Sequence, residues 1–384
     1  MRAKGPDVKS YMVSPMHLYA GSPEMRFWAR GLAMDDLAAD AIPVRERGYR
    51  NGLFLVTPQL TPALARLQTA YPGGRVREHR DALERLLFTS YEVDAAALNA
   101  AAGADAPWRQ PDARFGLRGT RRGQFRNGCA LAVSTAGRVH VADAGNGRIV
   151  LFDRDGTPLG RLRPPWTVDD TFRALSGVAV ASDGRLFALD REARTLTRFS
   201  PAGAGEWRTV LTDLMDPSAL AAAPDGSLLV IDSGQRTVVR LTADGRVAAR
   251  ASAANRFESP TAVAAALDGS VYVVDAAQGR VHQLSQELAP QSDWPFRRAG
   301  PPSASSIAVS PVDGAVYVIH AGAGTVGRYT PEGQFTWTVG DGGGAPPLLE
   351  PSAVATDAQG SVYVLDRARN QVVRFDVARQ SGVR

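Results

Sequence analysis

Short apolar runs separated by glycine-bearing turns recur along the last two thirds of the chain. In the stretch VADAGNGRIVLFDRDG, residues 141–156, one run ends at Asp143, a turn with two glycines and an asparagine follows, and the run RIVLF leads to Asp-Gly. Runs of this length, rich in valine, isoleucine and phenylalanine and without a helical period, are typical of β-strands. The stretch therefore predicts two strands joined by a turn.

This stretch belongs to one of six copies of a single pattern. The copies span residues 129–156, 176–203, 218–245, 261–288, 306–333 and 352–379. A turn glycine recurs at Gly137, Gly184, Gly226, Gly269, Gly314 and Gly360. Six residues after each glycine stand Asp143, Asp190, Asp232, Asp275, His320 and Asp366, at intervals of 42 to 47 residues. A β-rich repeat of this length has the size of one propeller blade.

A small residue also recurs in the first strand of each copy. It stands at Ala132, Ala179, Ala221, Ala264, Ala308 and Ala355. The innermost strands of a propeller converge on its axis, where larger side chains would clash, so alanine has a steric reason there. We therefore predict a mainly β protein whose larger part is a six-bladed β-propeller. The aspartates that end the second strands are predicted to accept hydrogen bonds from backbone amides of the next turn.

The sixth copy has no room for a fourth strand, because the chain ends soon after VVRFDVARQ, residues 372–380. The segment ARFGLRG, residues 113–119, precedes the first copy and is similar to QFTWTVG, residues 334–340, in the fourth-strand position of blade five. We therefore predict that residues 113–119 pair with blade six, so that strands from both ends of the chain close the ring.

Residues 1–95 lack the repeat. Strands are predicted at NGLFLVTP, residues 51–58, and within RVREH and RLLFTSYEV, residues 75–79 and 85–93. A helix is predicted to start at Thr61, with Pro62 in its first position, and to end before the Pro-Gly-Gly that follows Tyr71. The sequence thus predicts a small α/β domain over residues 1–95. Residues 96–112 form an Ala/Gly/Pro-rich linker, and residues 113–384 form the propeller.

The repeated pattern G-x-V/L-x-V/A-x-D, followed by a turn with Gly or Asn and then by R-I-V-x-F, resembles the NHL repeat family over residues 113–380. This resemblance implies a six-bladed propeller. The chain departs from the family pattern at His320, which replaces the aspartate, at one extra residue before Gly314, and in the second and third blades, which lack the Asn-x-Arg turn.

A second resemblance covers residues 10–95. The run LFLVTPQLTPALARLQTAYPGG and the later LLFTSYEV are similar to the soluble C-terminal domain of polytopic membrane glycosyltransferases of the protein-mannosyltransferase-like class. This resemblance implies an extracytoplasmic location in the cell envelope and a chain that starts as a fragment or a detached descendant of such a protein. Without it, the location expected is cytoplasmic. The catalytic acids of that class lie in its membrane part, so the resemblance assigns no catalytic residue here.

Composition narrows these possibilities only slightly. The hydrophobic content of 44% and charged content of 22% fit a folded globular protein. The single cysteine, Cys129, excludes an intrachain disulfide and a cysteine-based metal cluster. The first residues lack the apolar core of a secretory signal, and no run of 18 apolar residues predicts a membrane span.

The net charge of +5 is small for a nucleic-acid-binding protein. Residues 110–384 carry 30 arginines against 27 acids, which argues against nucleic acid as a partner. The histidines of the propeller, His140, His282 and His320, occupy different positions in different blades. The sequence therefore predicts neither a metal site nor a cofactor, and no convergent set of catalytic residues.

The loops that join successive blades vary most in length and share one face of the predicted propeller. The longest are residues 164–176, 254–260, 295–305 and 341–351, and residues 120–128 lead into blade one. These loops and their borders hold aromatic and arginine side chains, which often anchor protein and sugar partners. The candidate ligand-binding residues are Arg121, Arg122, Trp166, Arg173, Arg256, Phe257, Trp294, Phe296, Arg297, Arg298 and His320.

The function predicted from these features is non-catalytic: a binding or scaffold protein whose propeller loop face binds a protein or an acidic glycan, as the extracytoplasmic part of a glycosyltransferase-related protein if the N-terminal resemblance holds. Two alternatives stay open. The first is a propeller enzyme of the lyase or lactonase type, which would need an unorthodox site. The second is RNA binding, as in some NHL propellers.

Overall fold

The computed structural model describes two compact units. One comprises Met1–Trp108 with Gly342–Gly344, and the other comprises Arg109–Asp341 with Ala345–Arg384. The described residues are 8–13, 34–37, 51–56, 64, 67–68, 74–81, 84, 86–94, 111–164, 171–251, 257–296, 306–320, 324–339 and 348–377.

The first unit contains a five-stranded mixed sheet in the order β2-β1-β3-β5-β4. Its strands are β1 (Val8–Val13), β2 (Met34–Leu37), β3 (Asn51–Val56), β4 (Arg75–Arg80) and β5 (Leu86–Asp94). β1 is parallel to β2 and β3, whereas β5 is antiparallel to β3 and β4. The three predicted strands are confirmed as β3, β4 and β5. Most of the predicted helix lies outside the described residues, although Leu67 and Gln68 are helical.

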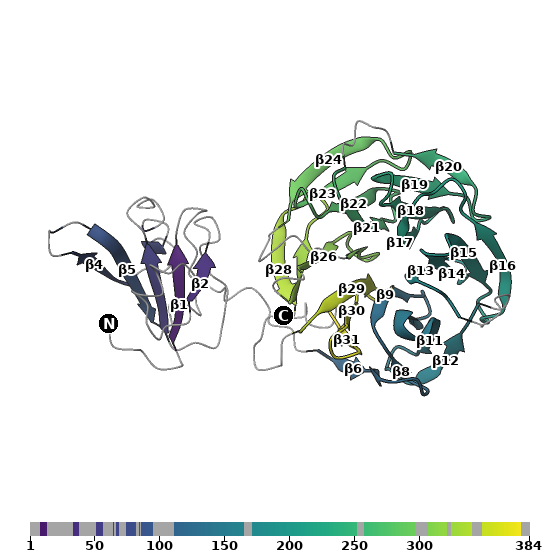
Figure 1. Ribbon diagram of the computed structural model, residues 1–384, viewed down its shortest axis with the longest axis horizontal. Helices are drawn as coiled ribbons and strands as arrows, with labels where there is room; N and C mark the ends of the chain where they lie inside the picture. The colour runs from purple at the N-terminus through teal and green to yellow at the C-terminus, as the bar shows by residue number, and fades with distance from the viewer. Residues whose placement is uncertain are drawn as a thin grey trace. The chain divides into compact units, whose positions relative to one another are not determined.

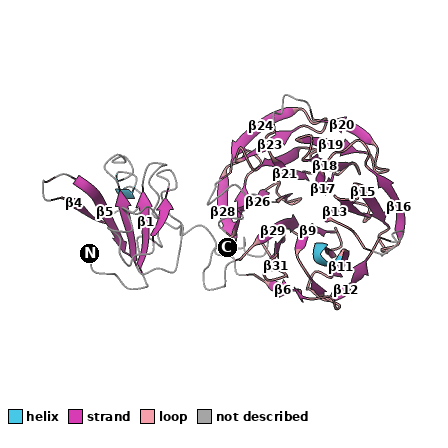
Figure 2. Ribbon diagram, in the orientation of Figure 1, coloured by secondary structure: helices cyan, strands magenta, loops and turns pink. Residues whose placement is uncertain are grey.

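The second unit contains six four-stranded antiparallel sheets arranged around a ring (Figures 1 and 2). Blade 1 consists of β9 (Gly128–Val133), β10 (Val139–Asp143), β11 (Arg148–Phe152) and β12 (Pro158–Leu162). Blade 2 consists of β13 (Leu175–Val180), β14 (Leu186–Asp190), β15 (Thr195–Phe199) and β16 (Gly205–Val210). Blade 3 consists of β17 (Pro217–Ala222), β18 (Leu228–Asp232), β19 (Thr237–Leu241) and β20 (Val247–Arg250).

Blade 4 consists of β21 (Pro260–Ala265), β22 (Val271–Asp275), β23 (Arg280–Leu284) and β24 (Pro290–Pro295). Blade 5 consists of β25 (Ile307–Val309), β26 (Val316–His320), β27 (Thr325–Tyr329) and β28 (Phe335–Val339). Blade 6 consists of β29 (Pro351–Thr356), β30 (Val362–Asp366), β31 (Gln371–Phe375) and β6 (Ala113–Phe115). The fold is a six-bladed β-propeller, which confirms the prediction.

The ring closes through β6, which comes from the opposite end of the chain to the rest of blade 6. β6 pairs antiparallel with β31, and Phe115 lies opposite Val372. The backbone N–H of Asp112 extends this contact by donating to the carbonyl oxygen of Arg374 at 2.8 Å. The predicted pairing of residues 113–119 with blade six is therefore confirmed for its first three residues. We call the contact between β6, blade 6 and blade 1 the seam.

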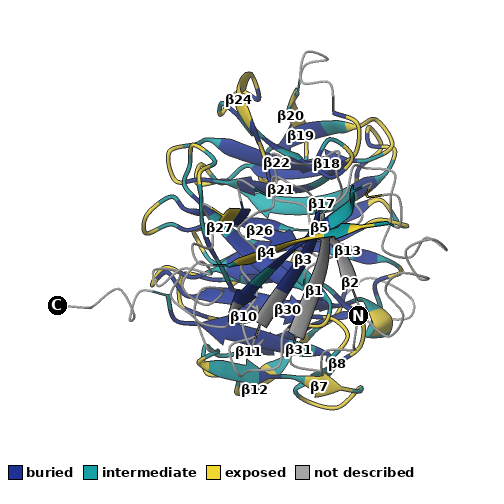
Figure 3. Cartoon of the chain, turned by 90° about the vertical axis from the view of Figure 1, so that its left-hand side faces the viewer, coloured by how far each residue is buried: buried dark blue, intermediate teal, exposed yellow. Residues whose placement is uncertain are grey.

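Apolar packing between neighbouring blades forms the core. The second strands are buried along their whole length and the third strands, except β23, along most of theirs, whereas the outer strands β12 and β16 alternate between exposed and half-buried residues (Figure 3). Three residues after each turn glycine, the second strand carries a buried side chain in every blade. These side chains belong to His140, Phe187, Leu229, Tyr272, Tyr317 and Tyr363. Burial of such large side chains stabilises the contact between adjacent blades.

The first residue of each repeat links the inner strands. It is Cys129 in blade 1 and a serine or threonine in the other five blades. Cys129 Sγ donates to the carbonyl oxygen of Leu175 in blade 2 at 2.9 Å, and Ser352 Oγ donates to that of Gly128 in blade 1 at 3.2 Å. Burial raises the pKa of the Cys129 thiol to about 12, so this cysteine stays protonated at neutral pH and acts as a structural group.

The aspartates that end the second strands fix the loops on one face. The Asp232 carboxylate accepts the N–H groups of Met215 at 2.9 Å and Asp216 at 3.0 Å, in the loop before β17. It also accepts those of Gly234 and Gln235, in the turn after β18. The predicted role in the turn is confirmed for Asp190, Asp232 and Asp275. Asp143 and Asp366 accept backbone N–H groups of the preceding loop instead, so the carboxylates hold the loops between blades as well. We call this end of the propeller the loop face and the other end the opposite face.

Candidate functional site

Four of the predicted binding residues are buried between blades. Phe257, Trp294, Phe296 and His320 are between 6% and 8% exposed. Trp294 packs against Tyr329 with ring centroids 4.9 Å apart, and His320 Nε2 shares a hydrogen bond of 2.9 Å with the Tyr329 hydroxyl. These side chains border the loops in the sequence but pack into the core. The structure therefore places them out of reach of a partner on the surface.

Four others, Trp166, Arg256, Arg297 and Arg298, lie outside the described residues, and their assignment stays a prediction. The remaining three, Arg121, Arg122 and Arg173, are exposed. Arg173 precedes blade 2, whereas Arg121 and Arg122 lie in the segment that leads into blade 1. Arg121 and Arg122 line a common hollow.

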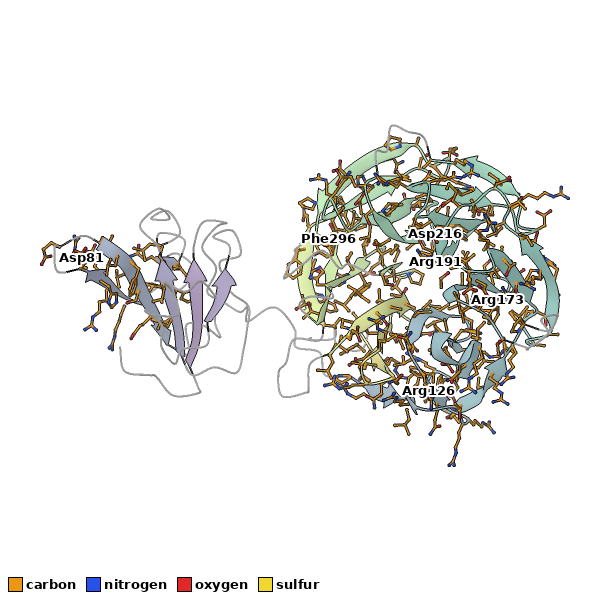
Figure 4. All side chains as sticks on the ribbon, in the orientation of Figure 1. Asp81, Arg126, Arg173, Arg191, Asp216 and Phe296 are labelled. Atoms are coloured by element: carbon orange, nitrogen blue, oxygen red, sulfur yellow. The ribbon has the colours of Figure 1, made fainter. Side chains whose placement is uncertain are left out.

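Positive charge is concentrated in one sector of the propeller. Residues 111–164, which contain β6, the segment after it and blade 1, carry ten arginines and four aspartates, a net charge of +6, while the whole chain carries +5. The other residues together are therefore close to neutral. Between residues 113 and 142 the chain has no acidic residue. Figure 4 labels Arg126, one of these arginines, at blade 1, and Arg173 in another sector.

We call residues 117–126 the arginine segment. It contains β7 (Leu117–Arg118) and β8 (Gln124–Phe125), which pair in parallel. Arg118, Arg121, Arg122 and Arg126 are exposed, and none of them forms an ion pair within the described part of the chain. Arg122 is held by hydrogen bonds from its guanidinium to the carbonyl oxygen of Pro158.

A buried ion pair shapes this segment. Arg148 Nε donates to Asp143 Oδ2 at 2.8 Å, and both side chains are almost fully buried, at 3% and 0% exposure. The other guanidinium nitrogens donate to backbone carbonyl oxygens of the arginine segment, at Thr120 (2.7 Å) and Gln124 (2.9 Å). Asp143 Oδ1 accepts the N–H of Arg126 at 2.8 Å. Through these hydrogen bonds to its backbone, the pair holds in place the loop that carries the exposed arginines.

Two open hollows flank the arginine segment. The seam hollow, of about 430 Å³, is lined by Arg118, Arg126, Asn127, Glu350, Arg367, Ala368 and Asn370. The rim hollow, of about 370 Å³, is lined by Arg121, Arg122, Gly123, Arg148, Val150, Leu159, Gly160 and Arg161. Leu117 and Leu159 add exposed apolar surface, at 60% and 45% exposure. Arginine beside exposed leucine is a composition suited to an acidic protein surface.

Arg118 and Arg126, which line the seam hollow, were not predicted from the sequence. The average charge of residues 110–384 hides the acid-free stretch before Asp143. A shorter window would have shown five arginines between residues 114 and 126. The missed signal was therefore local charge and not loop length.

The three histidines of the propeller lie in blades 1, 4 and 5. His282 Nε2 shares a hydrogen bond of 3.0 Å with Gln278 Oε1, and His140 is 5% exposed. In the described ranges, no group of three His, Cys, Asp or Glu side chains has the spacing of a metal site. Within the same ranges, no helix has the length and apolar character needed to cross a membrane.

Burial lowers the pKa of His140 to about 4, below the value near 6.5 expected in the unfolded chain. The unfolded state therefore takes up a proton first as the pH falls. We expect His140 to reduce stability progressively between pH 6.5 and 4, by about 3 kcal/mol in total, and to cost nothing above that window. In His140→Phe, which copies Phe187 of blade 2, this part of the acid sensitivity should be absent.

Urea unfolding at a series of pH values measures this effect. Equal acid sensitivity in the wild type and His140→Phe would show that His140 titrates normally in the folded state.

Comparisons with known proteins support the fold. No family model matches the chain, and no curated protein matches it significantly. A selenomethionine-substituted virginiamycin B lyase from Staphylococcus aureus aligns with a TM-score of 0.50 and 18% identity, over 68% of this chain and 85% of the lyase. A streptogramin B lyase aligns with a TM-score of 0.49 and 13% identity, over 78% of this chain and 86% of the other. At such identity the likeness concerns the fold alone, and nothing supports the glycosyltransferase resemblance of residues 10–95.

Proposed function

We propose that this chain is a binding protein whose blade 1 sector takes an acidic segment of a partner protein. The observation that carries the proposal is the arginine segment, which presents four exposed arginines without acidic partners beside two hollows. A guanidinium binds a carboxylate through two parallel N–H groups, so a row of arginines suits aspartate and glutamate side chains. The exposed Leu117 and Leu159 favour a protein over a glycan, because they offer apolar contacts as well.

The buried ion pair between Arg148 and Asp143 supports the proposal further. Arg148 and Asp143 hold the loop in one conformation before a partner arrives, so less conformational entropy is lost on binding. Each exposed arginine is expected to contribute up to about 1 kcal/mol, since water screens such pairs. Several contacts together are then needed for useful affinity.

Fluorescence anisotropy with a labelled deca-glutamate peptide tests this function. We expect binding by the wild type, none of a deca-glutamine peptide, and affinity that falls steeply between low and high salt. Arg121→Gln together with Arg122→Gln should weaken binding by about tenfold, which corresponds to about 1.4 kcal/mol.

The matched control removes the same charge elsewhere, through Arg208→Gln together with Arg236→Gln, two exposed arginines in blades 2 and 3. This variant should bind like the wild type. Equal losses in the two variants would reduce the effect to net charge and overturn the assigned surface. Tighter binding of a heparin fragment or an oligoribonucleotide than of the peptide would overturn the proposed class of partner.

We further propose that the propeller is of the NHL type, which rests on the recurring G-x-V/L-x-V/A-x-D pattern and its following turn. A lyase activity is the alternative favoured by the fold likeness to virginiamycin B lyase. It would be supported by a catalysed elimination that is lost on chelation of divalent metal, and this experiment does not depend on the binding assay.

A further inference from the structure

The seam hollow is built from both ends of the propeller chain. Arg118, Arg126 and Asn127 precede blade 1, whereas Glu350, Arg367 and Asn370 belong to blade 6. The two sides already touch at one point, where the N–H of Asn127 donates to Asn370 Oδ1 at 3.1 Å. A ligand in this hollow would therefore bind across the place where the ring closes.

The positively charged side chains that line the seam hollow outnumber the negatively charged ones. Arg367 forms an ion pair with Glu350, which is the only acidic residue of the lining. Arg118 and Arg126 form neither an ion pair nor a side-chain hydrogen bond within the described residues. The lining thus carries three guanidinium groups and one carboxylate. Like charges that line one hollow repel each other, and an anion placed between them offsets this electrostatic repulsion.

The other end of the seam shows what such an anion does. On the opposite face, Arg154 Nη2 donates to Ser361 Oγ at 2.8 Å, and its Nε lies 3.4 Å from Asp357 Oδ2. Arg374 lies 3.0 Å from Asp376, whose N–H donates to Asp112 at 2.6 Å. At that end the arginines of blades 1 and 6 have buried aspartates as counter-ions.

We propose that the seam hollow is an oxyanion site, filled by a carboxylate or a phosphate group that bridges Arg118 and Arg126 to the Arg367 side. Bound there, the anion supplies at the loop face the counter-ion that Asp357 and Asp376 supply at the opposite face. Binding then makes opening of the β6–β31 contact less frequent. The carboxylate form of this proposal rests on the proposed function, because it takes an acidic side chain of the partner as the ligand.

Hydrogen–deuterium exchange of the full chain tests the proposal, with inorganic phosphate and the deca-glutamate peptide as separate probes and chloride at equal ionic strength as the reference. At a probe concentration about twice its Kd, exchange in β6 and β31 should slow by roughly threefold, with a smaller change in β17 of blade 3. Slowing by phosphate alone assigns the site to free phosphate, and slowing by the peptide alone assigns it to a partner's carboxylate.

Two double variants complete the test. Arg118→Gln with Arg126→Gln should abolish the slowing, and among the described residues these exposed side chains form no ion pair or hydrogen bond. Arg208→Gln with Arg236→Gln should keep it. The proposal is overturned if the first variant still shows the slowing, or if the peptide binds and β6 and β31 respond no more than β17. Slowing by phosphate in a protein that does not bind the peptide would instead refute the proposed function and support the oxyanion site.

Discussion

Replacing Arg148 with alanine is expected to lower the unfolding free energy by about 3–5 kcal/mol, because the Asp143 carboxylate would stay buried without its cation. The carbonyl oxygens of Thr120 and Gln124 would also lose their donors. Urea unfolding followed by tryptophan fluorescence measures the change. The same variant should bind the acidic peptide more weakly, because the backbone of the arginine segment loses its hydrogen bonds from Arg148.

The control is Arg246→Ala, which removes an ion pair to Asp244 from a side chain that is 84% exposed. Exposed pairs contribute about 0–1 kcal/mol, so this variant should unfold nearly like the wild type. If Arg148→Ala cost no more than Arg246→Ala, the buried pair would not be the element that holds the arginine segment.

The second large effect is expected for Phe115→Ala, with a loss of about 3 kcal/mol. Phe115 is the one aromatic residue of β6. Its side chain is 8% exposed and packs on Phe152 with ring centroids 5.1 Å apart. Gly156 lies so close that an added Cβ would stand 2.5 Å from the Phe115 ring. The cavity left by alanine therefore weakens the strand that closes the ring.

Leu117→Ala serves as its control, because this neighbouring side chain is 60% exposed and should change the unfolding free energy by less than about 0.5 kcal/mol. Hydrogen exchange should locate the difference. In Phe115→Ala, β6 and β31 should exchange faster than in the wild type while blade 3 is unchanged. A uniform increase over all blades would contradict a local role at the seam.

The propeller could be predicted from the sequence because each structural requirement recurs six times. The turn glycines adopt positive φ, for example +78° at Gly137 and +81° at Gly360, which a residue with a side chain adopts only under strain. The aspartates that end the second strands are needed to satisfy backbone amides. Closure could be predicted as well, because blade six lacked a strand and residues 113–115 could supply it.

The strands of the first unit were harder to predict from the sequence. β3 and β5 carry buried apolar residues such as Phe54 and Tyr91, and these strands were found. β1 and β2 were missed because VKSYMV and MDDL contain too few apolar residues in alternation to predict a strand. Such strands are recognised by their pairing, of β1 with β3 and of β2 with β1, which a single sequence does not show.

The candidate site could be predicted only in part. Arg121 and Arg122 were predicted because they occur in a long loop, and they are exposed beside a hollow, whereas Trp294 and Phe296 occur equally close to a loop and are buried. Position along the chain does not say on which side of a strand a residue packs, and Trp294 packs toward Tyr329 of the next blade. Local charge separates the two cases better, since arginines without acidic neighbours stay at the surface.

Photo-crosslinking of the deca-glutamate peptide, carrying a benzophenone group, tests the central claim most directly. After ultraviolet irradiation and tryptic digestion, mass spectrometry identifies the crosslinked segments. We expect crosslinks to gather in residues 117–127 and 158–163 and to disappear at high salt. Crosslinks concentrated instead on blades 3 and 4, or spread evenly around the ring, would contradict it.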